Sequence, residues 1–250
     1  DVKSRRWKMI SAAYSDIGKK RLANEDSYFV SEFTKNIGYI IVADGMGGHR
    51  GGAVASKMTV DCIKSCFDKN FEWKNEGDIK NLLKNAIELA NKTVYAAAKE
   101  DSHLLGMGTT VVLCIVENEN LYIANVGDSR LYHITQDKIN QVTKDHSVVQ
   151  ELIDLGEISE KEAENHPNKN LITRAVGTNA DVETDFYKFK AKSGDMIVIC
   201  TDGLSNMVGK DEIKSIVTSE IDLKDAVKKL VDRANERGGL DNITVAAVKF

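Results

Sequence analysis

The sequence contains very little that could divide it into domains. One proline, Pro167, stands among 250 residues, and no low-complexity linker or internal repeat interrupts the chain. Since linkers between domains are usually rich in proline, glycine or polar residues, we expect a single domain over 9–250. Residues 1–8, a basic stretch before Met9, are expected to be an upstream remnant or a cloning scar.

Long apolar runs and an excess of positive charge are also missing. No run approaches the roughly 20 residues of a membrane-spanning helix, and no apolar segment of a signal peptide follows the basic start. The net charge of -4 does not suit non-specific binding of nucleic acid. These absences favour a cytoplasmic protein that binds neither membranes nor nucleic acids, with a monomer as the default state.

Cysteine is sparse and forms no redox or zinc motif. None of the four cysteines belongs to a CxxC pair, and Cys62 and Cys66 lack a histidine or cysteine partner at zinc-binding spacing. Free cysteine usually packs as a small apolar side chain. A packing role in a reducing, intracellular environment therefore fits better than a disulfide framework.

Short apolar runs rich in β-branched residues predict strands. These runs are residues 39–43, 109–116, 120–126, 130–134, 196–200 and 243–248. The polar links at 117–119 and 127–129 are short enough for hairpins, which favours antiparallel pairing. Apolar stripes that can cover a sheet mark the expected helices at 53–67, 78–99 and 222–236. The pattern predicts an α+β fold.

Residues 144–170 differ from the rest because they are charged, weakly periodic and contain the proline. They are expected to form an irregular helical insertion. Long segments of this kind in compact domains are often lids or binding loops. The alternative is a solvent-exposed segment without a binding role.

Acidic residues follow several expected strands. Asp44-Gly45 and Asp202-Gly203 each come at the end of an apolar run, and Asp128 follows another. Asp-Gly is also common turn chemistry, and Asp128 alone would suit a tight hairpin. The repetition, rather than any one pair, indicates a site.

Three further carboxylates, Glu25, Asp26 and Asp241, border apolar runs, and Asn242 adjoins the last of them. Carboxylates gathered on one rim would repel one another and raise one another's pKa values. Mg²⁺ or Mn²⁺ relieves that repulsion through all-oxygen ligation, and a metal pair activates water for attack on a phosphate ester. Because the sequence has no EF-hand calcium loop, catalytic metals are favoured.

A phosphate ester also needs a cation to hold its oxygens. Arg21, four residues before Glu25, can grip two of them, although it could equally be a surface arginine. The glycine-rich stretch 44–52 leads into a helix but lacks the GK[ST] signature of a P-loop. A mechanism with Asp44 as the phosphorylated nucleophile is a rival, yet Met46 stands where such enzymes expect a second aspartate.

Eight ordered motifs resemble those of the type 2C, metal-dependent protein serine/threonine phosphatases, the PPM family, and specifically their bacterial branch. They extend over essentially 9–250 and are RLANED (21–26), VADGMGGHRGG (42–52), GMGTT (106–110), NVGDSR (125–130), TKDHS (143–147), HPNKNLITRAVG (166–177), CTDGL (200–204) and GGLDNITV (238–245). The resemblance implies a four-layer α-β-β-α sandwich of two antiparallel sheets between helices. It also implies metals at one end and a mobile flap within about 144–175.

The resemblance further implies two tightly bound Mn²⁺ or Mg²⁺ ions. Asp44 would bridge both, Asp202 and Asp241 would complete the first site, and the carbonyl of Gly45 would join the second.

The remaining matching residues take supporting roles in this resemblance. Glu25 and Asp26 would act largely through metal-bound waters, and Asp128 would hold a third, weaker metal. Arg21 would bind phosphate, and Asn242 would support the neighbouring metal ligand.

One departure from the family pattern concerns the general acid. Eukaryotic relatives often place histidine directly after the Asp-Gly pair, where this sequence has Met46. His49, three residues on, or a metal-bound water could protonate the leaving alcohol. A purely structural His49 is the alternative.

Phosphorylated proteins are the substrates that the resemblance implies, with a serine/threonine kinase and its targets as physiological partners. The alternative is a catalytically weak relative that binds phosphoproteins or regulates a partner. Such relatives usually lose metal carboxylates, whereas every expected position is acidic here.

Overall fold

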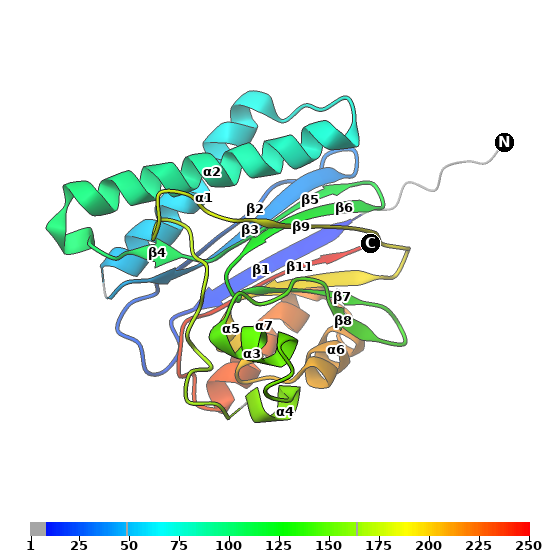
Figure 1. Cartoon of the computed structure of the whole chain (residues 1–250). Helices are drawn as coiled ribbons and strands as arrows, with labels where there is room; N and C mark the ends of the chain where they lie inside the picture. Colours follow the sequence, from blue (N-terminus) through cyan, green and yellow to red (C-terminus); the bar gives the residue numbers. More distant parts are fainter. Residues whose placement is uncertain (1–8, 49, 164) are drawn as a thin grey trace.

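Two antiparallel sheets pack face to face between two layers of helices in the computed structural model, which describes residues 9–48, 50–163 and 165–250 (Figure 1). Sheet A contains, in spatial order, β1 (Ile10–Asp16), β11 (Ile243–Lys249), β10 (Met196–Cys200), β7 (Arg130–Ile134) and β8 (Ile139–Gln141). Sheet B contains β2 (Asp26–Val30), β3 (Ile37–Met46), β5 (Val111–Glu117), β6 (Asn120–Val126) and β9 (Asp185–Lys190), and β4 (Gly108–Thr109) pairs with β3. Residues 1–8 and His49 lie outside the described residues.

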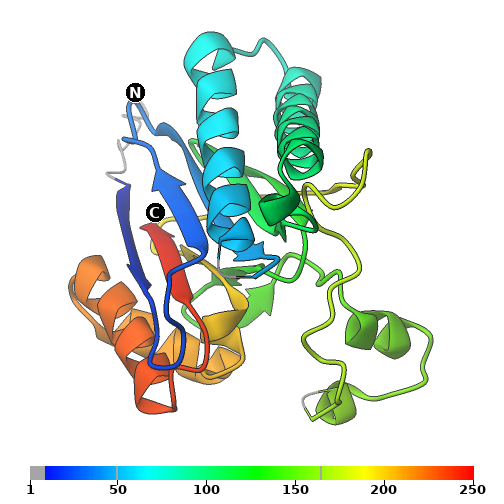
Figure 2. The same cartoon turned by 90° about the vertical axis from the view of Figure 1, so that its left-hand side faces the viewer.

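Helices cover the outer face of each sheet (Figures 1 and 2). The outer face of sheet B packs against α1 (Gly51–Asn70) and α2 (Glu76–Glu100). The outer face of sheet A packs against α5 (Asp202–Ser205), α6 (Lys210–Ser219) and α7 (Leu223–Glu236). The predicted four-layer α-β-β-α sandwich is therefore confirmed.

Strand β3 shows why the sequence of a central strand is apolar without alternation. Ile41 and Ala43 pack into the layer beneath α1 and α2, whereas Ile40 and Val42 pack between the two sheets. All four are fully buried. Since successive side chains point to opposite faces of a strand, both faces of β3 need apolar residues.

Helix α7 confirms the predicted apolar stripe. Its buried residues recur at helical spacing against sheet A and are Leu223, Ala226, Val227, Leu230, Val231 and Ala234. Asp222, which the periodicity placed inside the helix, is its N-cap: the side chain accepts a hydrogen bond of 2.7 Å from the backbone N–H of Lys224. Aspartate is a favoured N-cap because it satisfies such an N–H.

One of the two predicted hairpins is wrong. The link 117–119 does join β5 and β6 as antiparallel neighbours. The link 127–129 instead carries the chain from β6 in sheet B to β7 in sheet A. Gly127, with φ of 104°, lies in the region that favours glycine. Asp128 therefore lies on a crossing between the sheets.

The expected insertion contains α3 (Val148–Asp154) and α4 (Glu160–Ala163) and projects beside the sandwich (Figure 2). A bridge between Ser147 and Ile172 closes its stem. All four cysteines are free. Among the described residues, the model contains no helix with the length and apolarity of a membrane span.

Candidate metal centre

Five aspartates from both sheets face one another at one end of the sandwich. Asp26 and Asp44 are direct partners in the β2–β3 register. Asp128 comes from the crossing between β6 and β7, Asp202 begins α5, and Asp241 lies just before β11. Burial, together with the negative charges of the other four, raises the pKa of Asp44. The fold thus collects residues that are up to 215 positions apart in the sequence, from 26 to 241.

Asp44 lies inside β3 rather than at its exit, and its backbone is held firmly. Its carbonyl accepts hydrogen bonds from the backbone N–H of Thr110 at 2.9 Å and from Oγ1 of Thr109 at 2.8 Å. Its own N–H donates to Oγ1 of Thr110 at 3.0 Å. The Thr110 hydroxyl also lies 2.8 Å from Oγ of Ser129. The GMGTT segment therefore links Asp44 to the crossing that carries Asp128.

Asp26 is satisfied on one oxygen and not on the other. Oδ2 accepts hydrogen bonds from the hydroxyls of Thr201 at 2.9 Å and Thr244 at 2.7 Å. Oδ1 is buried and has no hydrogen-bond partner among the described residues. Burial raises the pKa of Asp26 to about 7, against the effect of the two threonines. One carboxylate oxygen is therefore available to a further ligand.

Burial and neighbouring negative charges also raise the pKa values of Asp128, Asp202 and Asp44. Burial, with help from Asp202, raises the pKa of Asp128 to about 8. Burial and Asp241 raise the pKa of Asp202 to about 6, although a hydrogen bond with Asp44 opposes the shift. Burial raises the pKa of Asp44 well above its ordinary value. These shifts favour the protonated forms of the three carboxyl groups in the metal-free protein.

Arg21 is paired with Asp241 at the exposed side of the cluster. Nη2 of Arg21 lies 2.6 Å from Oδ2 of Asp241, and this pair, with the charges of Glu25 and Asp44, raises the arginine pKa. The Arg21 side chain is 50% exposed. A guanidinium at this position can reach a ligand from solvent without leaving the cluster.

Asn242 fastens the loop that carries Arg21 and Glu25. Its Oδ1 accepts the backbone N–H of Glu25 at 2.8 Å, and its Nδ2 donates to the carbonyls of Ile17 at 2.9 Å and Ala23 at 3.0 Å. The predicted supporting residue therefore holds backbone on both sides of Arg21.

The glycines next to Asp44 allow the backbone to pack without side chains. A Cβ on Gly45 would lie 2.1 Å from the carbonyl oxygen of Gly52, and one on Gly52 would lie 2.3 Å from Oε2 of Glu25. The Glu25 carboxylate thus sits against the first turn of α1, where the helix dipole favours negative charge.

The donor set fits a hard divalent cation. Within the described ranges, no three histidine, cysteine or acidic side chains already stand in an arrangement that could hold a metal ion. The cluster nevertheless offers oxygen donors only, and the buried Oδ1 of Asp26 has no hydrogen-bond partner among the described residues. Mg²⁺ or Mn²⁺ accepts all-oxygen ligation and would offset the mutual repulsion of the carboxylates.

Four threonines that hold the aspartates are functional residues that the sequence analysis did not single out. Thr109 and Thr110 hold Asp44, and Thr201 and Thr244 hold Asp26. Each of the four lies inside a motif or directly beside an acidic residue, and this position in the sequence could have indicated its role. Met46 supplies no proton, since its methyl group packs near Gly108.

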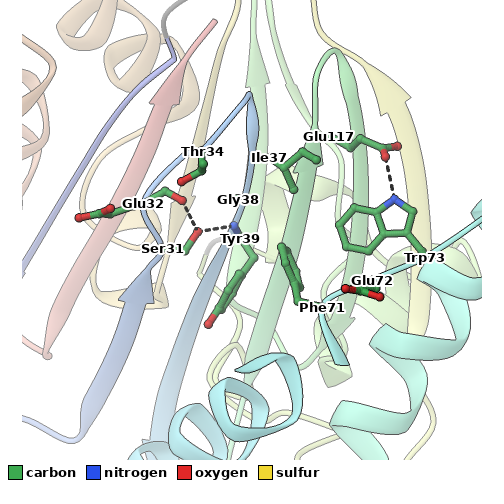
Figure 3. A pocket seen from close by; sticks show the side chains of 10 residues that line it. All are labelled: Ser31, Glu32, Thr34, Ile37, Gly38, Tyr39, Phe71, Glu72, Trp73 and Glu117. Atoms are coloured by element: carbon green, nitrogen blue, oxygen red, sulfur yellow. Dashed lines mark hydrogen bonds between the residues drawn. The ribbon is translucent and has the colours of Figure 1, made fainter. Parts of the chain in front are cut away.

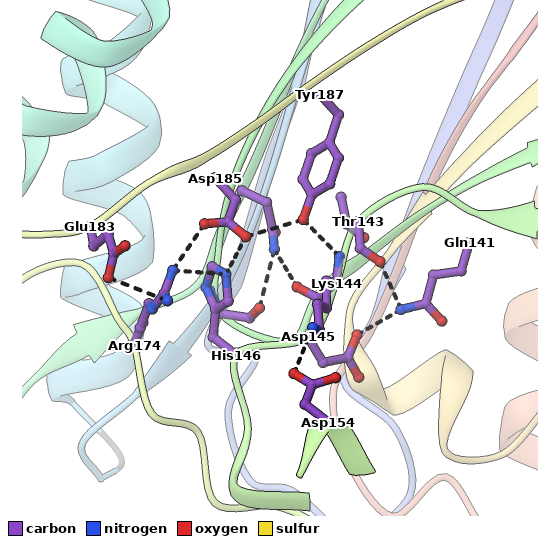
Figure 4. A network of polar contacts seen from close by, with 12 residues as sticks. Gln141, Thr143, Lys144, Asp145, His146, Asp154, Arg174, Glu183, Asp185 and Tyr187 are labelled. Atoms are coloured by element: carbon purple, nitrogen blue, oxygen red, sulfur yellow. Dashed lines mark hydrogen bonds and ion pairs between the residues drawn. The ribbon is translucent and has the colours of Figure 1, made fainter. Parts of the chain in front are cut away.

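A second polar cluster joins the stem of the insertion to sheet B (Figure 4). Nε2 of His146 lies 3.2 Å from Oδ2 of Asp185, which also binds Arg174 at 2.9 Å through Oδ1. The ring Nδ1 of His146 accepts the N–H of Gly127 at 3.0 Å. Burial lowers the pKa of His146, and the neutral ring is the form that can accept this bond.

Arg130 and Asp145 continue this second cluster towards Asp128. Nη2 of Arg130 lies 2.6 Å from Oδ2 of Asp145, and Nε donates to both carboxylate oxygens. Gln141 donates a further bond of 2.8 Å to Asp145. These side chains satisfy one another.

Cavity size does not identify the site. A cavity of about 260 Å³ lies beside Asp26, whereas one of about 570 Å³ lies at the opposite end of β3. The carboxylates, rather than the larger hollow, carry groups suited to hydrolysis.

Known proteins are similar to this chain in sequence and in fold. The family description Protein phosphatase 2C matches residues 17–244. The serine/threonine phosphatase stp of Listeria welshimeri is 40% identical over 235 residues, covering 94% of this chain and 93% of the relative. The solved structure of the S. agalactiae serine/threonine phosphatase has a TM-score of 0.91 at 38% identity, covering 97% of this chain and 99% of that one.

A solved structure with bound metal is similar as well. It is the catalytic domain of the serine threonine protein phosphatase PstP in complex with 2 manganese ions, with a TM-score of 0.84 and 31% identity. The similarity covers 96% of this chain and 97% of that one.

Proposed function

The chain belongs to the protein phosphatase 2C family and is a metal-dependent protein serine/threonine phosphatase, and from this premise we propose which residues hold the metals. Asp44 bridges two tightly bound Mn²⁺ or Mg²⁺ ions. Asp202 and Asp241 complete the first site, and the Gly45 carbonyl belongs to the second. The raised pKa values of Asp44 and Asp202 support this set, because burial and the neighbouring carboxylates both disfavour the charged forms that a bound cation would stabilise.

Glu25, Asp26 and Asp128 complete the proposal. Glu25 and Asp26 act largely through waters, and the partnerless Oδ1 of Asp26 is the single observation that carries the assignment most directly. Asp128 holds a third, weaker metal. Its position on the crossing between the sheets gives the carboxylate two supports, through Ser129 to Thr110 and through Gly127 to His146.

The residues of this chain bind and orient the phosphate ester. When bound, the metal pair supplies an activated water as nucleophile. Arg21 turns from Asp241 to the phosphate oxygens and neutralises their charge, as its exposure permits. Thr109 and Thr110 keep Asp44 at a fixed position, so the cluster does not need to reorganise when substrate arrives. His49 is retained as a candidate donor of the proton to the leaving alcohol.

The physiological setting follows from the family. Phosphoserine and phosphothreonine proteins are the substrates, and a serine/threonine kinase with its targets is the proposed counterpart. The proposal includes a cytoplasmic monomer that uses neither nucleic acid nor membrane as a partner.

Turnover of a phosphoserine peptide with added Mn²⁺, and again with excess EDTA, tests the proposed function. We expect turnover that depends on metal and returns when Mn²⁺ is restored. Asp145→Asn serves as a matched control, since it removes an aspartate charge outside the proposed ligand set. Full activity in excess EDTA would contradict the proposal.

A further inference from the structure

The larger cavity lies at the end of β3 that points away from the aspartates, and its volume is about 570 Å³ (Figure 3). It opens between the start of β3, the segment after α1 and the end of β5. The residues that line it are Ser31, Glu32, Thr34, Ile37, Gly38, Tyr39, Phe71, Glu72, Trp73 and Glu117. Nothing in the phosphatase chemistry described above uses this cavity.

Aromatic rings form one wall of the cavity and hold one another in place. Phe71 lies with its ring centroid 5.2 Å from Tyr39 and 4.9 Å from Trp73, the latter at an interplanar angle of 89°. The indole Nε1 of Trp73 donates a hydrogen bond of 2.7 Å to Oε1 of Glu117 (Figure 3). The wall is therefore ordered without a ligand, which lowers the entropic cost of binding one.

The charged groups of the cavity all have the same sign. Glu32, Glu72 and Glu117 are its only ionisable side chains apart from Tyr39, and none of the ten lining residues is a lysine or arginine. Glu32 and Glu72 are exposed and form no ion pair with a described residue. Aromatic faces beside unpaired carboxylates attract cations, and the guanidinium group suits this combination because it is planar and weakly hydrated.

We propose that this cavity is a docking site for a basic segment of a protein partner, with an arginine side chain stacked against Phe71 and Trp73 and paired with Glu72. The volume exceeds what a single small cation needs, so a peptide segment is the better occupant. The hydroxyl of the exposed Thr34 provides a hydrogen-bonding group for its backbone, whereas the Ser31 hydroxyl already bonds the backbone of Tyr39 and Glu32.

Strand β3 relates the docking site to the aspartate cluster. Tyr39 and Asp44 are five residues apart on this strand, which corresponds to about 17 Å at about 3.3 Å per residue. A phosphoprotein whose basic segment lies at least this far from its phosphoserine can engage both places. This extension to substrates rests on the proposed function, whereas the docking itself does not.

Fluorescence of Trp73 gives a test that does not depend on activity. The chain has two tryptophans, so Trp7→Phe in the full chain leaves Trp73 as the only one. An acetylated, amidated peptide with two arginines is titrated, and the same peptide with citrulline replacing arginine is the uncharged control. We expect a saturable change in emission with the arginine peptide alone.

Charge reversal locates the binding. Glu72→Lys should raise the Kd of the arginine peptide at least tenfold, whereas Glu100→Lys, an equal change of charge at the far end of α2, should leave it unchanged. An equal response to the citrulline peptide, or equal Kd values in the two variants, would overturn the docking site. So would a response to tetramethylammonium without one to the peptide, or self-association that accounts for the emission change.

Kinetics then test the link to substrates. For a phosphopeptide with an arginine pair seven or more residues from phosphoserine, Glu72→Lys should raise KM about tenfold and leave KM for p-nitrophenyl phosphate unchanged. Binding of the arginine peptide without this effect on KM would keep the docking site and overturn its use by substrates. If the parent protein turned over neither the phosphopeptide nor p-nitrophenyl phosphate, the proposed function would be contradicted and the fluorescence result would still stand.

Discussion

Asp128 and Asp145 are carboxylates on either side of Arg130, yet their surroundings differ. Asp145 receives hydrogen bonds from Arg130. It receives another from Gln141, and its neighbours are likewise paired with one another (Figure 4). Burial and the charge of Asp202 raise the pKa of Asp128 to about 8, although the charge of Arg130 opposes the shift. The cluster around Asp145 is complete in the protein alone, whereas the cluster around Asp128 carries charge that its own chain does not balance.

This contrast distinguishes charges that build the fold from charges that await a ligand. When one partner of a buried ion pair is removed, the other charge stays buried without compensation, so the free energy of unfolding falls. A carboxylate that repels its neighbours already destabilises the protein, so its loss affects function instead. The two clusters should therefore respond to substitution in opposite ways.

The largest effect is expected from Asp44→Asn. Turnover of a phosphoserine peptide should fall about a thousandfold or more, because the proposed bridging ligand to both metals is lost. The Tm of the metal-free variant should equal or exceed that of the parent protein, since repulsion is relieved. Kinetics at saturating Mn²⁺ and calorimetry in EDTA measure the two quantities. A markedly lower Tm would show that the Asp44 carboxylate stabilises the fold, as Asp145 is expected to do.

Asp145→Asn should show the reverse behaviour. Arg130 would lose its carboxylate in a largely buried position, which should lower the free energy of unfolding by about 3 kcal/mol. Turnover per folded molecule should stay within a few-fold of the parent value. Urea unfolding provides the measurement, and Asp154→Asn, which breaks the exposed pair with Lys144, is the control expected to change little. Equal losses in both variants would remove the distinction.

Asp128→Asn separates the third metal from the tight pair. Because Asp44 and Asp241 are untouched, calorimetric titration should show the tight sites retained and the weak site absent. Turnover at saturating Mn²⁺ should fall at least tenfold. Normal turnover at matched folded concentration would rule out the third-metal assignment. Loss of the tight sites would instead make Asp128 a ligand of the tightly bound metal pair.

Arg21→Ala tests an ion pair that resembles Arg130–Asp145 but lies in solvent. The exposed fractions of the Arg21 and Asp241 side chains are 50% and 34%, so the pair should contribute little to stability. KM for small phosphate esters should rise about tenfold with a smaller change in kcat, if Arg21 grips the phosphate in both the bound and the transition state. An unchanged KM would leave Arg21 outside the site.

The smallest effect is a pH dependence of stability confined to the metal-free protein. Burial raises the pKa values of Asp202, Asp26 and Asp128 to about 6, 7 and 8. Above pH 4 the folded state therefore holds protons that the unfolded state has released, so stability falls as pH rises and levels off above pH 8. Tm in EDTA should decrease by a few degrees from pH 5 to pH 8.

Saturating Mn²⁺ should remove this decrease, because the metal displaces the retained protons. Asp128→Asn should flatten it in EDTA. A Tm that rises with pH in the metal-free protein would contradict the assignment of excess negative charge.

The sequence predicts the layered architecture well because the central strands are buried on both faces and α7 has a strong apolar stripe. The strands that the sequence did not predict, β1, β2, β8 and β9, are the edges of the two sheets, where polar and apolar residues mix in partly exposed positions. The crossing at 127–129 was read as a hairpin because a short polar link has the same composition whether the next strand joins the same sheet or the facing one. Only tertiary packing makes that choice.

The acidic residues of the candidate site were predictable because carboxylates repeated at the ends of apolar runs suggest metal ligands. The four supporting threonines lie in the same motifs but were not predictable, because threonine is common on any strand. Nor does the sequence reveal that Arg130 forms its ion pair with Asp145 rather than with Asp128. That outcome depends on which way each side chain leaves the crossing between the sheets.

The first and last strands of the described chain are neighbours, and this pairing has a consequence for synthesis. β11 lies between β1 and β10, so Ile10–Asp16 has no partner in sheet A until Ile243–Lys249 emerges from the ribosome. Asp241 arrives just before that strand. The nascent chain therefore cannot complete either the sheet or the aspartate cluster early, and we expect a ribosome-bound chain that lacks β11 to be inactive and sensitive to proteases. Contacts of such long sequence separation form slowly, so the pairing of β11 with β1 and β10, rather than the synthesis of β11, should limit the appearance of activity.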